Sequence, residues 1–188
     1  MYNQYLEAFL QVEGHYPARD ELVKKFAWAI PSNEAVELIA KYSPIVEMGA
    51  GTGYWAMMIE QAGGKVECFD LNPPLLGKNN YRHKRQCHKI GKGTPLKLRN
   101  DKFKDHTLFL CWPPCYDNTA LHSIKHFKGH RLIYVGEGSG GCNANDEFFD
   151  MLDNEWEEQE SLDIPQWNAI HDNLTIYKRL KKKNIIGV

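Results

Sequence analysis

The chain has 188 residues, of which 43% are hydrophobic and 25% are charged, and its formal net charge is −1. This length is enough for one domain with its own core, and the composition excludes a disordered or collagen-like chain. No run approaches the roughly 20 apolar residues of a membrane helix, and the first residues lack a signal-peptide pattern. The five cysteines form no C-x-x-C pair, so we expect free thiols and a cytoplasmic protein.

Helices are expected before the first strand. Residues 2–12 and 20–27 place apolar side chains at helical spacing. A third helix follows Pro31 and extends to about residue 42, with Ser32 as its expected N-cap.

A strand, a glycine turn and a helix come next. The strand covers 45–48, the helix begins at Tyr54, and a second strand over 65–70 ends in Asp70. In a βαβ unit this arrangement binds an adenine nucleoside. The glycines let the backbone approach the ligand, and the carboxylate accepts hydrogen bonds from the ribose hydroxyls.

The spacing of the glycines narrows the class of ligand. Gly49, Gly51 and Gly53 form G-x-G-x-G, whereas the dinucleotide pattern G-x-G-x-x-G needs a glycine where Tyr54 stands. A pyrophosphate is therefore disfavoured relative to a ligand with an amino-acid tail. With Glu47 two residues before the first glycine, the turn resembles the first motif of class I S-adenosylmethionine (SAM)-dependent methyltransferases.

This resemblance implies a set of contacts to SAM as cofactor. The glycine turn would lie against the methionine part, Glu47 would bind the ammonium group, and Asp70 would hold the ribose. Leu71 would border the adenine. Many relatives meet the adenine amino group with an acid after the third strand, but this sequence has none there, so backbone groups would have to replace it. The predicted cofactor-binding residues are Glu47, Gly49, Ala50, Gly51, Gly53, Asp70, Leu71 and Cys111.

The remaining pattern completes an α/β fold. Alternating strands and helices predict a mostly parallel sheet, and the last two strands, with no helix between them, predict an antiparallel hairpin at an edge. We therefore expect a Rossmann-like, doubly wound, seven-stranded, mostly parallel sheet with an antiparallel last strand and N-terminal helices. Residues 72–106 hold too few apolar residues to predict a helix after the second strand. The later strands are expected over 86–90, 107–111, 131–135, 157–163 and 173–179, and a helix over 145–154.

The family resemblance also implies how the single domain is divided. It would comprise residues 1–188, with a helical lid over 1–43 and a Rossmann-like core over 44–188.

The sequence C-W-P-P-C-Y over 111–116 follows the fourth strand. Amino-methylating relatives carry a polar residue, two prolines and an aromatic residue there. The prolines match, but Trp112 replaces the polar residue, Cys115 replaces the aromatic one, and Tyr116 comes one residue late. A rigid turn after a core strand would also explain the prolines. We predict that the methyl-transfer site includes Trp112, Pro113, Pro114 and Tyr116.

A glycine-rich loop over 136–141 follows the fifth strand and contains Glu137. Glu137 is a catalytic candidate, either to orient a substrate or to act as a base. A flexible connector with a solvated acid explains the same residues equally well. Trp28, Trp167 and His171 are weaker candidates, because packing or capping also explains them.

Charge is segregated along the chain. Residues 78–104 hold ten Lys or Arg and one acid, residues 178–183 hold five more Lys or Arg, and residues 146–163 hold nine acids and no base. The tract 78–104 mixes bases with Tyr81, as nucleic-acid surfaces do, so nucleic acid is a candidate partner. A solvated face is the alternative.

We therefore interpret the chain as a SAM-dependent methyltransferase that needs no metal, membrane or obligate protein partner. Its methyl acceptor is unidentified: an amino group of a nucleobase, a small planar molecule and a protein side chain all fit. Two other functions stay open. One is a catalytically inactive SAM- or nucleoside-binding module, and the other is a nicotinamide-dependent oxidoreductase with an unusual glycine loop.

Overall fold

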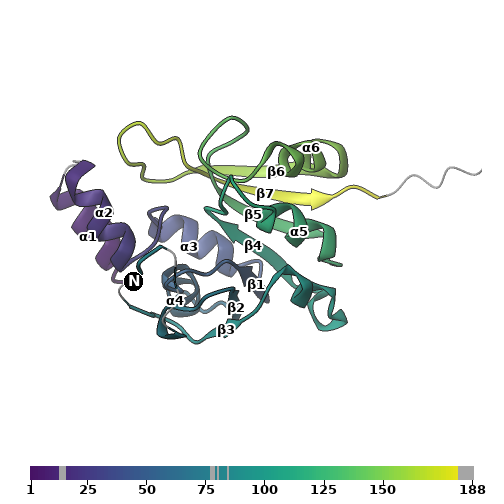
Figure 1. The fold of residues 1–188 in the computed structure, drawn as a ribbon, viewed down its shortest axis with the longest axis horizontal. Coiled ribbons are helices and arrows are strands. Elements are labelled where there is room, and N and C mark those ends of the chain that lie inside the picture. Colours follow the sequence, from purple (N-terminus) through teal and green to yellow (C-terminus); the bar gives the residue numbers. More distant parts are fainter. Residues whose placement is uncertain (13–15, 77–78, 80, 84, 182–188) are drawn as a thin grey trace, which may run out of the picture.

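The computed structural model describes residues 1–181 except 13–15, 77–78, 80 and 84, and within these residues it contains one seven-stranded sheet (Figure 1). The order across the sheet is β3-β2-β1-β4-β5-β7-β6. The strands are β1 (Ile45–Met48), β2 (Val66–Asp70), β3 (Ile90–Lys92), β4 (Thr107–Cys111), β5 (Arg131–Gly136), β6 (Trp156–Asp163) and β7 (Asn173–Arg179).

The direction of the strands confirms the predicted fold class. β7 is antiparallel to both of its neighbours, and all the other described pairs are parallel. The hairpin of β6 and β7 forms one edge of the sheet, as expected. The strand order reverses between β1 and β4, and open α/β sheets bind ligands beyond the carboxyl ends of the strands at such a reversal.

Helices cover both faces of the sheet, because successive strand residues point to opposite sides. Ile45 and Phe109 pack on the face that carries α3 and α4, whereas Val46 and Leu108 pack on the face of α5 and α6. No described helix combines the length and the apolar character that a membrane span requires. The helices are α1 (Gln4–Gln11), α2 (Tyr16–Lys25), α3 (Asn33–Ala40), α4 (Tyr54–Gln61), α5 (Thr119–His126) and α6 (Asp146–Glu155).

The N-terminal helices share the core of the sheet. Tyr5 of α1 is fully buried, and its ring stacks on Phe26 with the centroids 4.9 Å apart. The indole N–H of Trp167, in the β6–β7 loop, donates to the Tyr5 hydroxyl at 3.1 Å. Figure 1 shows this loop beside α1 and α2 at one end of the molecule. The predicted N-cap is confirmed, since Ser32 Oγ accepts from the N–H of Ala35 at 3.0 Å.

The connection between α2 and α3 is held by side-chain hydrogen bonds to its backbone. Four carbonyls of this segment accept from side chains of other elements, so the segment that carries Trp28 is fixed in place. The acceptors are the carbonyls of Lys25, Phe26, Ala29 and Pro31, and their respective donors are Arg85, Thr52, Trp55 and Asn3.

The predicted third strand was misplaced. The sequence pattern put it at 86–90, but β3 covers Ile90–Lys92. The N–H of Cys87 donates to the carbonyl of Thr52 at 2.7 Å, so residues 86–89 cross the glycine turn instead of pairing with β2. Between β2 and β4, the described residues form only 3₁₀ turns besides β3: Pro74–Leu76, Pro95–Arg99 and Asp101–Phe103.

Candidate functional site

A cavity of about 180 Å³ lies at the carboxyl ends of β1, β2 and β4, where the strand order reverses. Its lining combines the glycine turn, the end of β2 and the Pro-Pro turn after β4. Most of the residues predicted from the sequence therefore meet in one place. Of the predicted set, the cavity is lined by Gly49, Gly51, Asp70, Leu71, Cys111, Trp112, Pro113, Pro114 and Tyr116.

The glycine turn is tied to β2 and keeps one face open. The N–H groups of Gly49 and Ala50 both donate to the carbonyl of Phe69, at 2.8 and 3.0 Å. Gly49 has φ of +82°, and a Cβ added there would meet nothing within 4 Å. The turn therefore presents bare backbone to the cavity, which allows close approach of a ligand.

Asp70 lies at the tip of β2, with both carboxylate oxygens oriented by backbone donors. Oδ2 accepts from the N–H of Gly51 at 2.9 Å, and Oδ1 accepts from the N–H of Asn72 at 2.8 Å. Each carboxylate oxygen can accept more than one hydrogen bond, so two acceptor sites still remain available to a ligand. The carboxylate is held rigidly beside the turn.

Glu47 is buried inside β1 and is not paired with a cation. Its side chain is 2% exposed, and Oε2 has no hydrogen-bond partner among the described residues. Burial, with a smaller contribution from Asp70, raises the pKa of Glu47 to about 8. An unpaired buried carboxyl group is costly, so this site favours a ligand that brings a positive charge or a donor.

His83 enters the cavity from the β2–β3 connection, and it was not predicted as a site residue, although it lies within the basic tract 78–104. Its Cε1 lies 2.8 Å from the position that a Cβ on Gly51 would occupy. Neither ring nitrogen has a hydrogen-bond partner in the described part of the chain, and burial lowers the pKa of His83. The imidazole is thus a neutral polar group above the turn, able to donate from one nitrogen and accept at the other.

The N-terminus of α4 is closed to a bulky anion. Thr52 Oγ1 accepts from the N–H of Tyr54 at 3.1 Å, so one of the free donors is already used. A Cβ on Gly53 would lie 2.9 Å from the Cβ of His88. Because a dinucleotide places its pyrophosphate at this helix end, the packing here disfavours such a ligand.

Trp112 has a strained backbone that three contacts maintain. Its φ is +52°, a left-handed value that bulky residues seldom adopt. Its backbone N–H donates to the carbonyl of Val135 at 2.8 Å, and its indole N–H donates to Oδ1 of Asp172 at 2.7 Å. Its ring also stacks on Trp28, with centroids 5.0 Å apart and planes 11° apart. Such strain persists only where the surroundings enforce it, and it often marks a functional site.

Aromatic rings form one wall of the cavity. The edge of Tyr81 meets Trp28 with centroids 6.0 Å apart, and the hydroxyls of Tyr81 and Tyr116 are hydrogen-bonded to each other. Trp28 was a weak candidate in the sequence, while Tyr81 was noted only for its place in the basic tract. The Arg19 guanidinium already lies 5.4 Å from the centres of both the Trp28 and the Trp112 rings, so the ring surface that lines the cavity suits a planar ligand.

Asp172 is a buried carboxyl group that sequence analysis missed. Its side chain is 1% exposed, and its second oxygen, Oδ2, has no described hydrogen-bond partner. Burial raises the pKa of Asp172 to about 7. It precedes β7, far from Trp112 in the sequence, so no local pattern could have linked the two. His171, the neighbour that the sequence singled out, does not line the cavity.

Glu137 is not in the cavity. It is 6% exposed, and its two carboxylate oxygens accept from the N–H groups of Cys142 at 2.8 Å and His171 at 3.0 Å. These bonds lower the pKa of Glu137 against the effect of burial. The carboxylate thus joins the loop after β5 to the loop before β7. It is neither free to act as a base in the cavity nor exposed to solvent.

Three predicted cofactor residues lie behind the cavity wall. Glu47 and Ala50 are buried, and Gly53 packs against the β2–β3 connection. They pack beneath the glycine turn, and Oε2 of Glu47 is a buried oxygen without a described hydrogen-bond partner.

Two bases of the tract 78–104 contact other elements of the fold. Arg85 donates to the carbonyl of Lys25 at 2.8 Å, and Lys102 pairs with Glu67 at 2.6 Å. Its charges are thus divided among several elements. Lys78 and Lys84, which also belong to this tract, lie outside the described residues.

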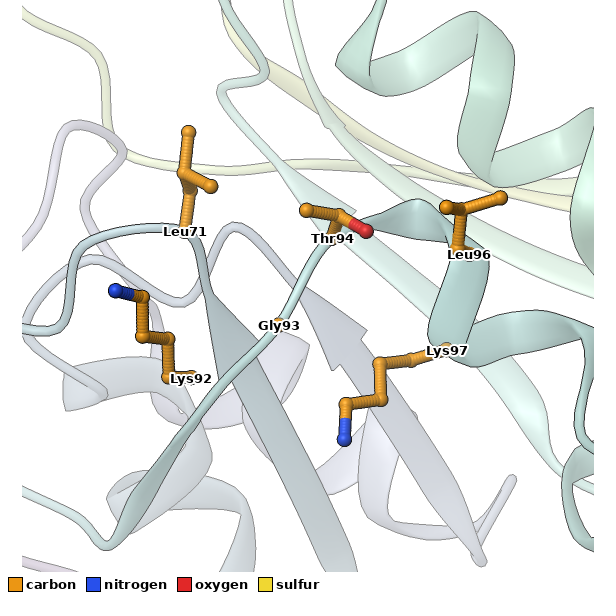
Figure 2. A pocket seen from close by; sticks show the side chains of 6 residues that line it. All are labelled: Leu71, Lys92, Gly93, Thr94, Leu96 and Lys97. Atoms are coloured by element: carbon orange, nitrogen blue, oxygen red, sulfur yellow. The ribbon is translucent and has the colours of Figure 1, made fainter.

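A shallow groove of about 400 Å³ continues the cavity past the ends of β2 and β3. The two spaces share Leu71, Gly93 and Thr94. Figure 2 shows Leu71 and Leu96 at the two ends of this strip, with Gly93 and Thr94 between them. Leu71 and Leu96 are 57% and 56% exposed, which leaves an apolar surface for a flat ligand.

Comparison with known proteins shows that this chain resembles solved structures in its fold. No protein-family model and no curated protein matches this sequence. Solved structures do match, and three are representative. Magnesium protoporphyrin IX methyltransferase from Synechocystis PCC 6803, with bound SAM, has a TM-score of 0.57 at 12% identity, over 94% of this chain and 92% of its own.

The second is the N-methyltransferase NodS from Bradyrhizobium japonicum WM9, with a TM-score of 0.54 at 14% identity, over 79% of this chain and 94% of its own. The third is 1,6-didemethyltoxoflavin-N1-methyltransferase from Burkholderia thailandensis, solved with 1,6-didemethyltoxoflavin and S-adenosylhomocysteine. Its TM-score is 0.52 at 14% identity, over 96% of this chain and 92% of its own. The chain therefore has the fold of class I SAM-dependent methyltransferases, as predicted.

The raised pKa of Glu47 has a measurable effect on folding. Because the fold binds this proton more tightly than the unfolded chain does, Glu47 stabilises most at low pH and loses that contribution as pH rises toward 8. Glu47→Gln removes the titration. From pH 5.5 to 8, the free energy of unfolding of Glu47→Gln should rise relative to wild type by up to about 3 kcal/mol, at about 1.4 kcal/mol per pH unit.

Urea unfolding at the two pH values measures this difference. Glu37→Gln, an exposed change on α3, is the matched control and should give nearly the same difference at both pH values. A Glu47→Gln difference that is also independent of pH would show that Glu47 is ionised in the folded protein.

Proposed function

We propose that this protein binds SAM and transfers its methyl group to a small planar acceptor. The observation that carries the proposal is the buried, unsatisfied carboxyl group of Glu47 behind an open glycine turn, with Asp70 at the neighbouring strand tip. The fold of class I methyltransferases, and the SAM or S-adenosylhomocysteine bound in two of the compared structures, support it.

The residues of the turn fit the amino-acid end of SAM. Glu47 would accept a hydrogen bond from the ammonium group, directly or through water, and the bare backbone at Gly49 would admit the methionine chain. An ammonium group beside Glu47 would supply the missing countercharge and favour the ionised carboxylate. His83, above Gly51, would offer a neutral donor to the same end of the ligand.

The nucleoside end fits Asp70 and the groove of Figure 2. The oriented carboxylate of Asp70 would accept from the ribose hydroxyls. The adenine would lie between Leu71 and Leu96, over Gly93 and Thr94. No acid is among the described residues that line this groove, so the Thr94 hydroxyl and backbone carbonyls would meet the adenine amino group. The cavity alone is small for a cofactor, since pockets for ligands of this size are roughly 300–1,000 Å³, but cavity and groove are continuous.

Methyl transfer requires the protein to position the methyl donor and the acceptor. When bound, SAM supplies a methyl group on a positively charged sulfur that needs no further activation. The rings of Trp112 and Tyr116 would stabilise that charge by cation–π attraction and hold a flat acceptor in line. Trp28 would exclude water from the reacting atoms. Asp172 would act through Trp112, as the residue that positions the indole.

One alternative function has an observation in its favour. The turn after β4 lacks the polar side chain that holds the amino group in amino-methylating relatives, and Trp112 stands there instead. An inactive SAM-binding module would show the same cavity. Conversion of SAM to S-adenosylhomocysteine in the presence of a pool of planar amines separates the two functions. The oxidoreductase is disfavoured by the closed N-terminus of α4.

The role of Asp70 is tested by SAM binding. Asp70→Ala should weaken SAM binding by about 1–3 kcal/mol, because buried ribose hydroxyls lose a charged acceptor. The same change removes two hydrogen bonds to the backbone, so thermal stability without ligand is measured alongside. Glu67→Gln, an exposed change on the same strand, is the control and should leave SAM affinity unchanged. Calorimetry that finds equal SAM affinity in wild type and Asp70→Ala would exclude the ribose contact.

The role of Trp112 is tested by separating turnover from binding. Trp112→Ala should lower turnover about a hundredfold, the effect of misplacing an acceptor by ~1 Å, while SAM affinity changes little. Trp112→Phe keeps an aromatic face but loses the bond to Asp172, so its turnover should be intermediate. A crystal structure with SAM gives an independent check. If both the Trp112 and Tyr116 rings lay beyond about 6 Å from the methyl carbon, this role for the turn would be wrong.

A further inference from the structure

A groove lined by basic residues lies at the end of α5 that points away from the cavity. Thr119, the first residue of this helix, lines the cavity. The last turn carries Lys125 and His126 and borders an open groove of about 600 Å³. At 1.5 Å per residue, the two ends of the helix are roughly 12 Å apart. The groove is lined by Arg99, Lys125, His126, Phe127, Lys128 and Arg179.

Basic residues from three separate segments converge on this groove, and no acid lines it. Arg99 ends the 3₁₀ turn after β3, Lys125 and Lys128 lie at the end of α5, and Arg179 ends β7. Lys128 pairs with Asp101 at 2.6 Å at the exposed rim. Among the described residues, Arg99 and Lys125 have no ion pair, so the groove holds an uncompensated positive charge.

Arg179 has the geometry of an anion receptor. Its Nη2 donates to the carbonyl of Ile124 at 2.9 Å, and its guanidinium lies 4.5 Å from the centre of the Trp156 ring. Its Nε is buried and has no hydrogen-bond partner in the described structure. Glu155, close enough to favour the charged guanidinium, does not hydrogen-bond to this Nε. The guanidinium is held on the face of an aromatic ring and keeps N–H groups that no described residue accepts from. Such a guanidinium can donate two parallel hydrogen bonds to the oxygens of a phosphate group.

The end of a helix alone does not explain this arrangement. The dipole of α5 favours cations near its last carbonyls, which accounts for Lys125. It does not account for Arg99 and Arg179, which come from other segments. Arg99 donates to Nδ1 of His126 at 3.3 Å, and burial together with Arg99 lowers the pKa of this imidazole, so His126 orients Arg99 as a neutral acceptor.

We propose that this groove binds a phosphate group through Arg179, Arg99 and Lys125. The phosphate is either a free phosphate or part of the phosphodiester backbone of a polynucleotide, since both present the same oxygens. The site is distinct from the cavity and does not depend on methyl transfer. Of the predicted basic tract 78–104, it uses Arg99 alone.

The test compares two probes on the full chain: inorganic phosphate by calorimetry, and a fluorescein-labelled 12-nucleotide single-stranded RNA by anisotropy. Both are measured at ~50 mM salt, and RNA also at higher salt. The double variant Arg99→Gln/Lys125→Gln should bind the preferred probe at least tenfold more weakly, as the loss of charge-assisted hydrogen bonds predicts. The control Lys41→Gln/Lys65→Gln loses the same charge at exposed positions outside the groove and should change affinity less than twofold.

Arg179→Lys separates a built site from general attraction. It keeps the charge but loses the fork, so we expect affinity to fall by about tenfold. If this variant also lowers the melting temperature, the exposed double variant decides the question.

If phosphate binding saturates and the affinity for RNA is no higher than the affinity for phosphate, a free phosphate is the ligand. Tighter RNA binding that weakens with salt, with a shallower salt dependence in the double variant, identifies a polynucleotide. The proposal is overturned if neither probe binds at ~50 mM salt, or if the control variant loses as much affinity as the groove variant.

Discussion

The arrangement of this site depends on one buried carboxyl group. Glu47 lies within the central strand, beneath the turn at the reversal of the sheet, and the described residues leave one of its oxygens without a partner. Burying such a group without a partner costs stability, and a cation or donor beside it would reduce that cost. The tight glycine turn, the oriented Asp70 and the open cavity lie around this group.

The β2–β3 connection gives this chain its own version of the fold. Where a helical crossover is usual, His83 and His88 of this connection lie against Gly51 and Gly53 of the glycine turn. This path has two consequences. It packs His88 against Gly53 and closes the N-terminus of α4, and it brings Tyr81 and His83 into the cavity wall. The shape of the cavity therefore depends on this connection as well as on the glycine turn.

Local sequence patterns were enough for most of the fold. Apolar runs located β1, β4, β5 and β7, and the glycine spacing located the turn, because these signals are contained within a few consecutive residues. Contacts between distant segments were not predictable in this way. The third strand was misplaced because a hydrogen bond from Cys87 to Thr52 outweighed local β propensity. Asp172 was missed because only the folded chain brings it to Trp112. Glu137 was predicted as a catalytic candidate or a solvated acid, because no local pattern indicates that its carboxylate accepts hydrogen bonds from two separate loops.

In the proposed function, the carboxylate of Glu47 accepts a hydrogen bond from the ammonium group of SAM, and the number of protons released on binding measures this contact. Titration of SAM and of NADH at pH 7, in buffers of different ionisation enthalpy, gives both the affinity and the number of protons exchanged. We expect that SAM binds and NADH does not, and that wild type releases more protons than Glu47→Gln, because the raised pKa of Glu47 falls when the cation arrives. Binding of NADH without SAM, or equal proton exchange in wild type and Glu47→Gln, would contradict it.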